Sequence, residues 1–112
     1  MKTFRQFLED IRLYRGGKLP KDMVVSQNPI ARLYLSQNPG VMDIGGRWFT
    51  NEIEDAKWYS RENDSPIFYI DIPEKDIKKY NVRNFPQAAQ YSRKPDVEFI
   101  LPKELANQAK ML

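Results

Sequence analysis

The chain contains no cysteine and no histidine among its 112 residues. Without cysteine there is no disulfide framework and no thiolate nucleophile. The absence of both residue types excludes zinc sites ligated by histidine or thiolate, and also Ser-His-Asp and Cys-His catalytic arrangements. Any general acid or base must therefore be a carboxylate, a lysine or a tyrosine, and we expect a site that needs no metal.

Glycine and long apolar runs are also scarce. The five glycines lie at positions 16, 17, 40, 45 and 46, and they form no glycine-rich phosphate-binding loop. No apolar run approaches the ~20 residues needed to cross a bilayer. Residues 1–5 lack the apolar segment of a secretion signal. We therefore expect a cytoplasmic protein with no membrane partner.

The composition is that of a folded protein, with 41% hydrophobic and 12% aromatic residues. This length predicts one domain spanning residues 1–112. The net charge of +3 is unevenly distributed, because both ends are basic while residues 52–76 hold eight acidic and three basic side chains. No nucleic-acid-binding motif accompanies the basic ends, so ordinary solvated surface is favoured over a nucleic-acid interface.

The apolar pattern predicts an α+β fold, in which short helices flank a mixed or antiparallel sheet. Strands are expected at residues 11–15, 46–50, 66–72 and 97–101, with a short extended piece at 23–25. Helices are expected to begin at Thr3, Pro29, Asn51 and Pro102, where capping residues or prolines precede helical spacing. A capping box formed with Glu54 is expected at Asn51, and the helix from Pro102 is expected to reach Ala109. A short helix is expected at residues 74–80. Residues 81–95 are expected to form a long loop around one turn of helix.

The most informative stretch is residues 46–59, an aromatic strand that leads directly into a helix and brings Trp48 and Tyr59 near each other. An arginine, Arg15, precedes it and a glutamate on a strand, Glu98, follows it. This set suits NAD. Aromatic rings stack on the cationic nicotinamide, arginine binds phosphate, and a carboxylate stabilises the oxocarbenium-like state formed when the nicotinamide–ribose bond breaks.

Three blocks carry a family resemblance: Tyr14-Arg15-Gly16, then Gly46-Arg47-Trp48-Phe49 with Tyr59, then Glu98-Phe99-Ile100-Leu101. In kind and order they resemble the ADP-ribosyltransferase superfamily, which includes diphtheria toxin and the poly-ADP-ribose polymerases. That resemblance implies an ADP-ribosyltransferase-like fold and NAD as cosubstrate.

The resemblance also implies a role for each residue. Arg15 would bind the adenosine ribose or the phosphates of NAD, and the backbone of Gly16 would approach the nicotinamide amide. Trp48 and Tyr59 would enclose the nicotinamide ring, and Glu98 would be the catalytic carboxylate. Phe49 and Thr50, on the strand of Trp48, would complete the cofactor-binding set.

The first ten residues resemble the start of small proteins of tailed bacteriophages. This resemblance favours a phage setting. Together with the superfamily resemblance it implies an effector in the host cytoplasm that transfers ADP-ribose to a macromolecular acceptor, with protein favoured over nucleic acid. Two alternatives remain open: a non-enzymatic α+β module that binds a protein, such as a phage inhibitor or accessory protein, and a degenerate transferase fold that binds nucleotide without turnover.

Each candidate residue also has a plainer interpretation. Trp48, Phe49 and Tyr59 have the size and spacing of core residues. Arg15 could be a surface arginine at the end of a strand. Glu98 interrupts an apolar strand, and strand alternation could turn it toward solvent.

Overall fold

The computed structural model describes residues 9–23, 27–38 and 44–112. Its five strands are β1 (Asp10–Gly16), β2 (Trp48–Thr50), β3 (Ile67–Pro73), β4 (Glu98–Ile100) and β5 (Lys110–Met111). They form one open sheet in the order β4-β2-β1-β3-β5, and every neighbouring pair is antiparallel. The α+β prediction is confirmed, and the sheet is antiparallel rather than mixed.

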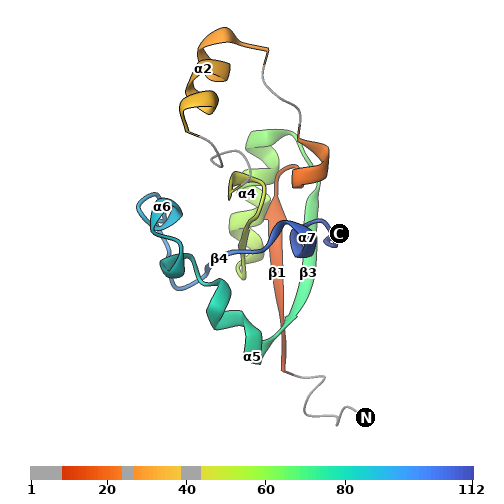
Figure 1. Ribbon diagram of the computed structural model, residues 1–112. Coiled ribbons are helices and arrows are strands. Elements are labelled where there is room, and N and C mark those ends of the chain that lie inside the picture. The colour runs from red at the N-terminus through yellow and green to blue at the C-terminus, as the bar shows by residue number, and fades with distance from the viewer. Residues whose placement is uncertain (1–8, 24–26, 39–43) are drawn as a thin grey trace.

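Short helices flank this sheet, except α2, which stands apart from it (Figure 1). The α-helices are α2 (Pro29–Gln37), α4 (Ile53–Asn63), α5 (Glu74–Ile77), α6 (Pro86–Ala89) and α7 (Lys103–Ala106). Single 3-10 turns occur at η1 (Pro20–Asp22), η2 (Lys78–Tyr80) and η3 (Val82–Asn84). Among the described residues, no helix has both the length and the apolar character that a membrane crossing requires.

The central pair of strands follows from side-chain alternation. Strands β1 and β3 pair along their full length, with Ile11 opposite Ile72 and Leu13 opposite Ile70. Because successive side chains point to opposite faces, these residues all lie on one face. Leu13, Ile70 and Ile72 are buried there, and each stabilises the fold by about 1.5–3 kcal/mol.

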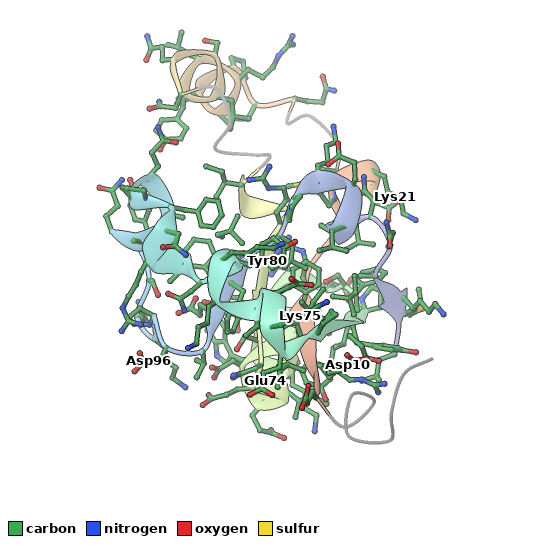
Figure 2. All side chains as sticks on the ribbon, turned by 60° about the horizontal axis from the view of Figure 1, so that its bottom comes forward. Asp10, Lys21, Glu74, Lys75, Tyr80 and Asp96 are labelled. Atoms are coloured by element: carbon green, nitrogen blue, oxygen red, sulfur yellow. The ribbon has the colours of Figure 1, made fainter. Side chains whose placement is uncertain are left out.

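That face carries the main core, over which η1 and α7 lie. Leu19 precedes η1 and Ala106 ends α7, and both belong to the core cluster with Leu13, Phe49 and Phe99. Tyr80, labelled in Figure 2, packs against the same cluster from η2. The cluster thus joins residues from the first strand to the C-terminal part of the chain, and none of its residues comes from α2.

Helix α4 lies on the opposite face of the sheet and packs directly on Gly16. A Cβ at Gly16 would be 1.9 Å from the carbonyl oxygen of Ala56 and 2.4 Å from the amide nitrogen of Ser60. Glycine is therefore required at this position, because the helix backbone occupies the space of any side chain.

The start of α4 differs from the predicted capping box at Asn51. The N-cap residue is Glu52, whose side chain makes no capping hydrogen bond. Instead the Thr50 hydroxyl accepts a hydrogen bond from the Glu52 amide at 3.1 Å. The prediction was wrong because the strand ends in a turn closed by Thr50, which moves the start of the helix one residue along the chain.

The turn of helix predicted within residues 81–95 is present as α6, and the rest of this segment is more ordered than the predicted loop. A second core cluster of Val82, Ala88 and Ile100 holds η3 and α6 against β4, and Trp48 packs on it. The side-chain amide of Asn81 also donates to the carbonyl oxygen of Pro95 at 2.7 Å. Burial of Val82 and Ala88, which the local pattern did not reveal, explains the difference.

Other elements match the predictions to different extents. Helix α2 begins at Pro29 as predicted, with Asn28 as N-cap. The predicted helix at 102–109 ends at Ala106, and the chain then enters the unpredicted strand β5. A two-residue strand has too little pattern to be recognised. The helix predicted from Thr3 and most of the extended piece at 23–25 lie outside the described residues.

Candidate functional site

A cleft of about 680 Å³ lies on the α4 face of the sheet. Its floor includes β2 and β4, one wall is α4, and the other is the segment formed by residues 91–94. Its lining residues are Tyr14, Arg15, Gly16, Gly45, Trp48, Phe49, Thr50, Asp55, Ala56, Trp58, Tyr59, Asn63, Tyr91, Arg93, Lys94 and Glu98. This volume is typical of a small-molecule site. All seven residues that the sequence singled out border the cleft.

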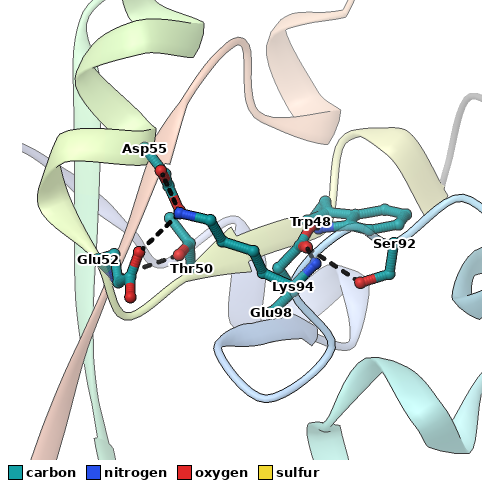
Figure 3. Close-up of polar contacts among 7 residues, drawn as sticks. All are labelled: Trp48, Thr50, Glu52, Asp55, Ser92, Lys94 and Glu98. Carbon is teal, nitrogen blue, oxygen red and sulfur yellow. Dashed lines mark hydrogen bonds and ion pairs between the residues drawn. The ribbon is translucent and has the colours of Figure 1, made fainter.

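Glu98 does not simply face solvent, because its carboxylate is held by three donors. Oε2 accepts a hydrogen bond from Trp48 Nε1, and Oε1 accepts from the Ser92 hydroxyl at 3.0 Å and the Lys94 amide at 2.9 Å (Figure 3). A carboxylate oxygen has two lone pairs, so Oε2 keeps one acceptor position for a ligand donor such as a hydroxyl. The carboxylate is therefore oriented without being saturated.

Trp48 belongs both to the core and to the cleft. It packs against the second core cluster, which includes Val82 and Ile100, and it also lines the cleft. Its indole N–H is engaged by Glu98, which fixes the rotation of the ring. The core interpretation and the binding interpretation of this residue are thus compatible.

Arg15 is half-buried at the end of β1, where its guanidinium spans two backbone carbonyls. Nε donates to Lys18 at 2.9 Å and Nη1 donates to Trp48 at 3.0 Å. Burial lowers the pKa of Arg15 to about 10, which leaves it a cation at neutral pH. Two of the five N–H donors of the guanidinium are used in this way, and the residue also borders the cleft.

Gly16 borders the cleft beside Arg15, and its carbonyl oxygen accepts a long hydrogen bond of 3.4 Å from the Asn63 side chain. The resemblance to the ADP-ribosyltransferase superfamily implied that this glycine lets a ligand approach the backbone. The structure supplies a further reason, which is the packing of α4 against it.

The α4 wall presents two adjacent aromatic rings. Tyr59 and Trp58 are about half exposed, and their ring centroids lie 5.0 Å apart in an edge-to-face arrangement. Tyr91 borders the cleft from the other wall and is 71% exposed. Tyr59 is therefore not a core residue, and exposed aromatic surface is available for stacking on a flat ligand.

Phe49 and Thr50 occupy less open positions. Phe49 is 1% exposed and its side chain belongs to the main core, so the plainer interpretation applies to that side chain. Thr50 is also buried, pairs with Glu98 across the β2–β4 ladder, and caps the turn before α4. Both border the cleft as parts of its floor.

Lys94 connects the two walls. Its ammonium group lies 3.1 Å from Glu52 Oε2 and 3.1 Å from Asp55 Oδ2, at the start of α4. Figure 3 shows the side chain extended between the carboxylate of Glu98 and these two acidic residues. The hydrogen bond to Asp55, and to a smaller extent the one to Glu52, raises the pKa of Lys94 above its ordinary value.

Sequence reasoning missed Ser92, Lys94, Asp55 and Trp58 as site residues. Trp58 stands next to Tyr59 and could have been noticed from its aromatic neighbour. Ser92 and Lys94 precede β4 in a segment without regular periodicity, and only folding brings them to Glu98. Asp96, which lies between them and Glu98 in the chain, instead points outward and pairs with Arg83 at 2.7 Å (Figure 2).

Within the ranges that the structure describes, no group of three or more acidic side chains is arranged to hold a metal ion. The expectation of a metal-free site stays a prediction. No family model, no curated protein and no solved structure matches this chain. Its function must therefore be argued from the cleft itself.

Proposed function

We propose that this protein is an NAD-dependent ADP-ribosyltransferase, with Glu98 as its catalytic carboxylate. One observation carries the proposal: Glu98 borders a cleft that aromatic rings and an arginine also line, and its carboxylate is oriented there by Trp48, Ser92 and Lys94. A carboxylate in that position would accept a ribose hydroxyl and stabilise the positive charge that develops on the ribose.

The remaining residues suit the other parts of NAD. The faces of Trp48 and Tyr59 would hold the flat, cationic nicotinamide by stacking and cation–π attraction. Arg15, with N–H donors beyond those bound to carbonyls, would bind the phosphates. The nicotinamide leaves with the electrons of its bond to ribose, and a nucleophile of a macromolecular acceptor, for which we favour a protein, forms the new bond and loses a proton.

The test is release of nicotinamide from NAD by the purified protein, alone and with cell extract. We expect Glu98→Gln to lower the rate by at least about a hundredfold, because glutamine keeps the shape of the side chain but not its charge. Asp96→Asn is the matched control, since that exposed carboxylate pairs with Arg83 outside the cleft. It should leave the rate unchanged.

The acceptor is identified by NAD labelled in its adenosine half. Label that stays on extract material and is removed by protease would indicate a protein, and removal by nuclease would indicate a nucleic acid. If folded wild-type protein releases no nicotinamide in any mixture, or if Glu98→Gln is as active as wild type, the transferase proposal is wrong.

Protein binding without catalysis is the second candidate, and α2 favours it. Ile30, Leu33 and Tyr34 are 80%, 59% and 51% exposed on this helix, which has no buried residue. In Figure 1, α2 stands apart from the sheet. This candidate predicts that the biological effect survives Glu98→Gln, whereas a degenerate transferase would bind NAD without releasing nicotinamide.

A further inference from the structure

Lys94, in the wall formed by residues 91–94, contacts both the floor of the cleft and the start of α4, through two different groups. Its backbone amide donates to Glu98 Oε1 at 2.9 Å, while its ammonium group donates to Glu52 and to both oxygens of Asp55 at 3.1 Å. The same residue thus holds the carboxylate and binds the first turn of α4 (Figure 3).

The segment formed by residues 91–95 contains no helix or strand. It nevertheless supplies two of the three donors to Glu98, the Ser92 hydroxyl and the Lys94 amide. Backbone hydrogen bonds anchor its ends, from the Tyr91 and Ser92 amides to carbonyls of α6 and from the Val97 amide to the Lys94 carbonyl. The ammonium group of Lys94 adds the side-chain link to the start of α4, so loss of this link is expected to change how the segment holds Glu98.

We propose that Lys94 is a positioning residue, whose ammonium group fixes residues 91–95 against α4 so that Ser92 and the Lys94 amide orient Glu98 in the cleft. The catalytic consequence rests on the proposed transferase function. The orientation of Glu98 is a property of the fold and can be measured without NAD.

The ion pairs of Lys94 contribute little to global stability. The side chains of Lys94, Glu52 and Asp55 are 53%, 46% and 29% exposed, and exposed pairs of this kind have small effects on folding. Lys94→Met keeps most of the apolar stem and is expected to fold. A loss of activity in that variant would therefore reflect the position of Glu98 rather than unfolding.

The direct measurement is the indole N–H resonance of Trp48 in ¹⁵N-labelled protein, because that group binds Glu98. Assignment follows from a Trp58→Phe variant. We expect Lys94→Met to move the resonance in the same direction as Glu98→Gln. Lys57→Met is the matched control, because Lys57 pairs with the exposed Glu54 and both residues lie on α4. This variant should leave the Trp48 resonance unmoved.

A second variant tests the other end of the link. Replacing both Glu52 by Gln and Asp55 by Asn removes the two negative charges that Lys94 binds without altering residues 91–95. The double variant should move the Trp48 resonance as Lys94→Met does. The single variant Lys94→Arg, which keeps a cation at this position, should leave the resonance near its wild-type position. An unmoved resonance in both Lys94→Met and the double variant would overturn the proposal.

Kinetics supply the second readout. In nicotinamide release, Lys94→Met should lower kcat by up to about a hundredfold with little change in KM, and Lys94→Arg should recover most of it. If wild type releases no nicotinamide while the resonance still moves as described, the transferase function fails and the positioning role stands. If release is normal in Lys94→Met and the resonance is unmoved, the positioning role fails and the transferase function stands.

Discussion

Trp48 and Glu98 are diagonal neighbours on adjacent strands, and the indole N–H of one donates to the carboxylate of the other. In the β2–β4 ladder, Trp48 pairs with Ile100 and Thr50 pairs with Glu98, so the two side chains share a face two residues apart in register. Long side chains reach across this diagonal. The geometry of the candidate site therefore depends on the register of two three-residue strands.

Replacing Trp48 by Phe tests that relationship. The variant keeps an aromatic ring but removes the donor to Glu98, and we expect the free energy of unfolding to fall by about 2 kcal/mol. Urea titration measures this loss. Trp58→Phe is the control, because Trp58 is half exposed, and it should cost much less. If the free energy of unfolding falls equally in the two variants, the hydrogen bond between Trp48 and Glu98 does not stabilise the fold.

Gly16→Ala tests the packing of α4 on the sheet. The added methyl would lie 1.9 Å from a backbone oxygen of Ala56, which can move only with the helix. We expect destabilisation of about 3 kcal/mol or more, measured by thermal or urea unfolding. Gly45→Ala is the control, because a Cβ there meets no atom within 4 Å. A Gly16→Ala protein as stable as Gly45→Ala would show that α4 is placed differently.

Arg15→Lys separates charge from geometry in the cleft. Lysine keeps the positive charge but lacks the planar fork that reaches the Lys18 and Trp48 carbonyls. We expect a higher KM for NAD in nicotinamide release with a smaller change in kcat, and stability lower by about 1 kcal/mol. An unchanged KM would argue against Arg15 as a phosphate ligand.

The Arg12–Asp71 pair predicts a pH effect. Arg12 Nε lies 2.8 Å from Asp71 Oδ1, and this hydrogen bond holds the pKa of Asp71 below its ordinary value. A depressed folded-state pKa adds stability at pH values above the unfolded pKa, and that contribution is lost as the pH falls through the folded pKa. It is small because both side chains are largely exposed.

An NMR titration of the Asp71 carboxyl carbon measures this directly. Arg12→Gln should raise the pKa of Asp71 toward its ordinary value and weaken the acid-dependent loss of stability. Lys79→Gln, which removes the exposed pair with Asp76, is the control and should leave the Asp71 titration unchanged. If Asp71 titrates identically in Arg12→Gln and wild type, the pair does not persist in solution.

Local sequence patterns predicted the elements whose signals are contained within one short stretch. Strand β1 follows from the alternation of Ile11 and Leu13, and α2 from Asn28 followed by proline. Strand β5 and the turns that hold Val82 had no comparable signal. Their conformations come from contacts with distant residues, such as the Leu112 amide with the Ile67 carbonyl.

The sequence by itself determined which faces of the strands are apolar, because side-chain alternation is a local property. It also determined the order of the arginine, the aromatic residues and the glutamate along the chain. Only the tertiary structure decided that Glu98 meets Trp48, fifty residues away, and that Ser92 and Lys94 hold its carboxylate. Strand order, register and the position of an irregular segment depend on long-range packing, which no local pattern contains.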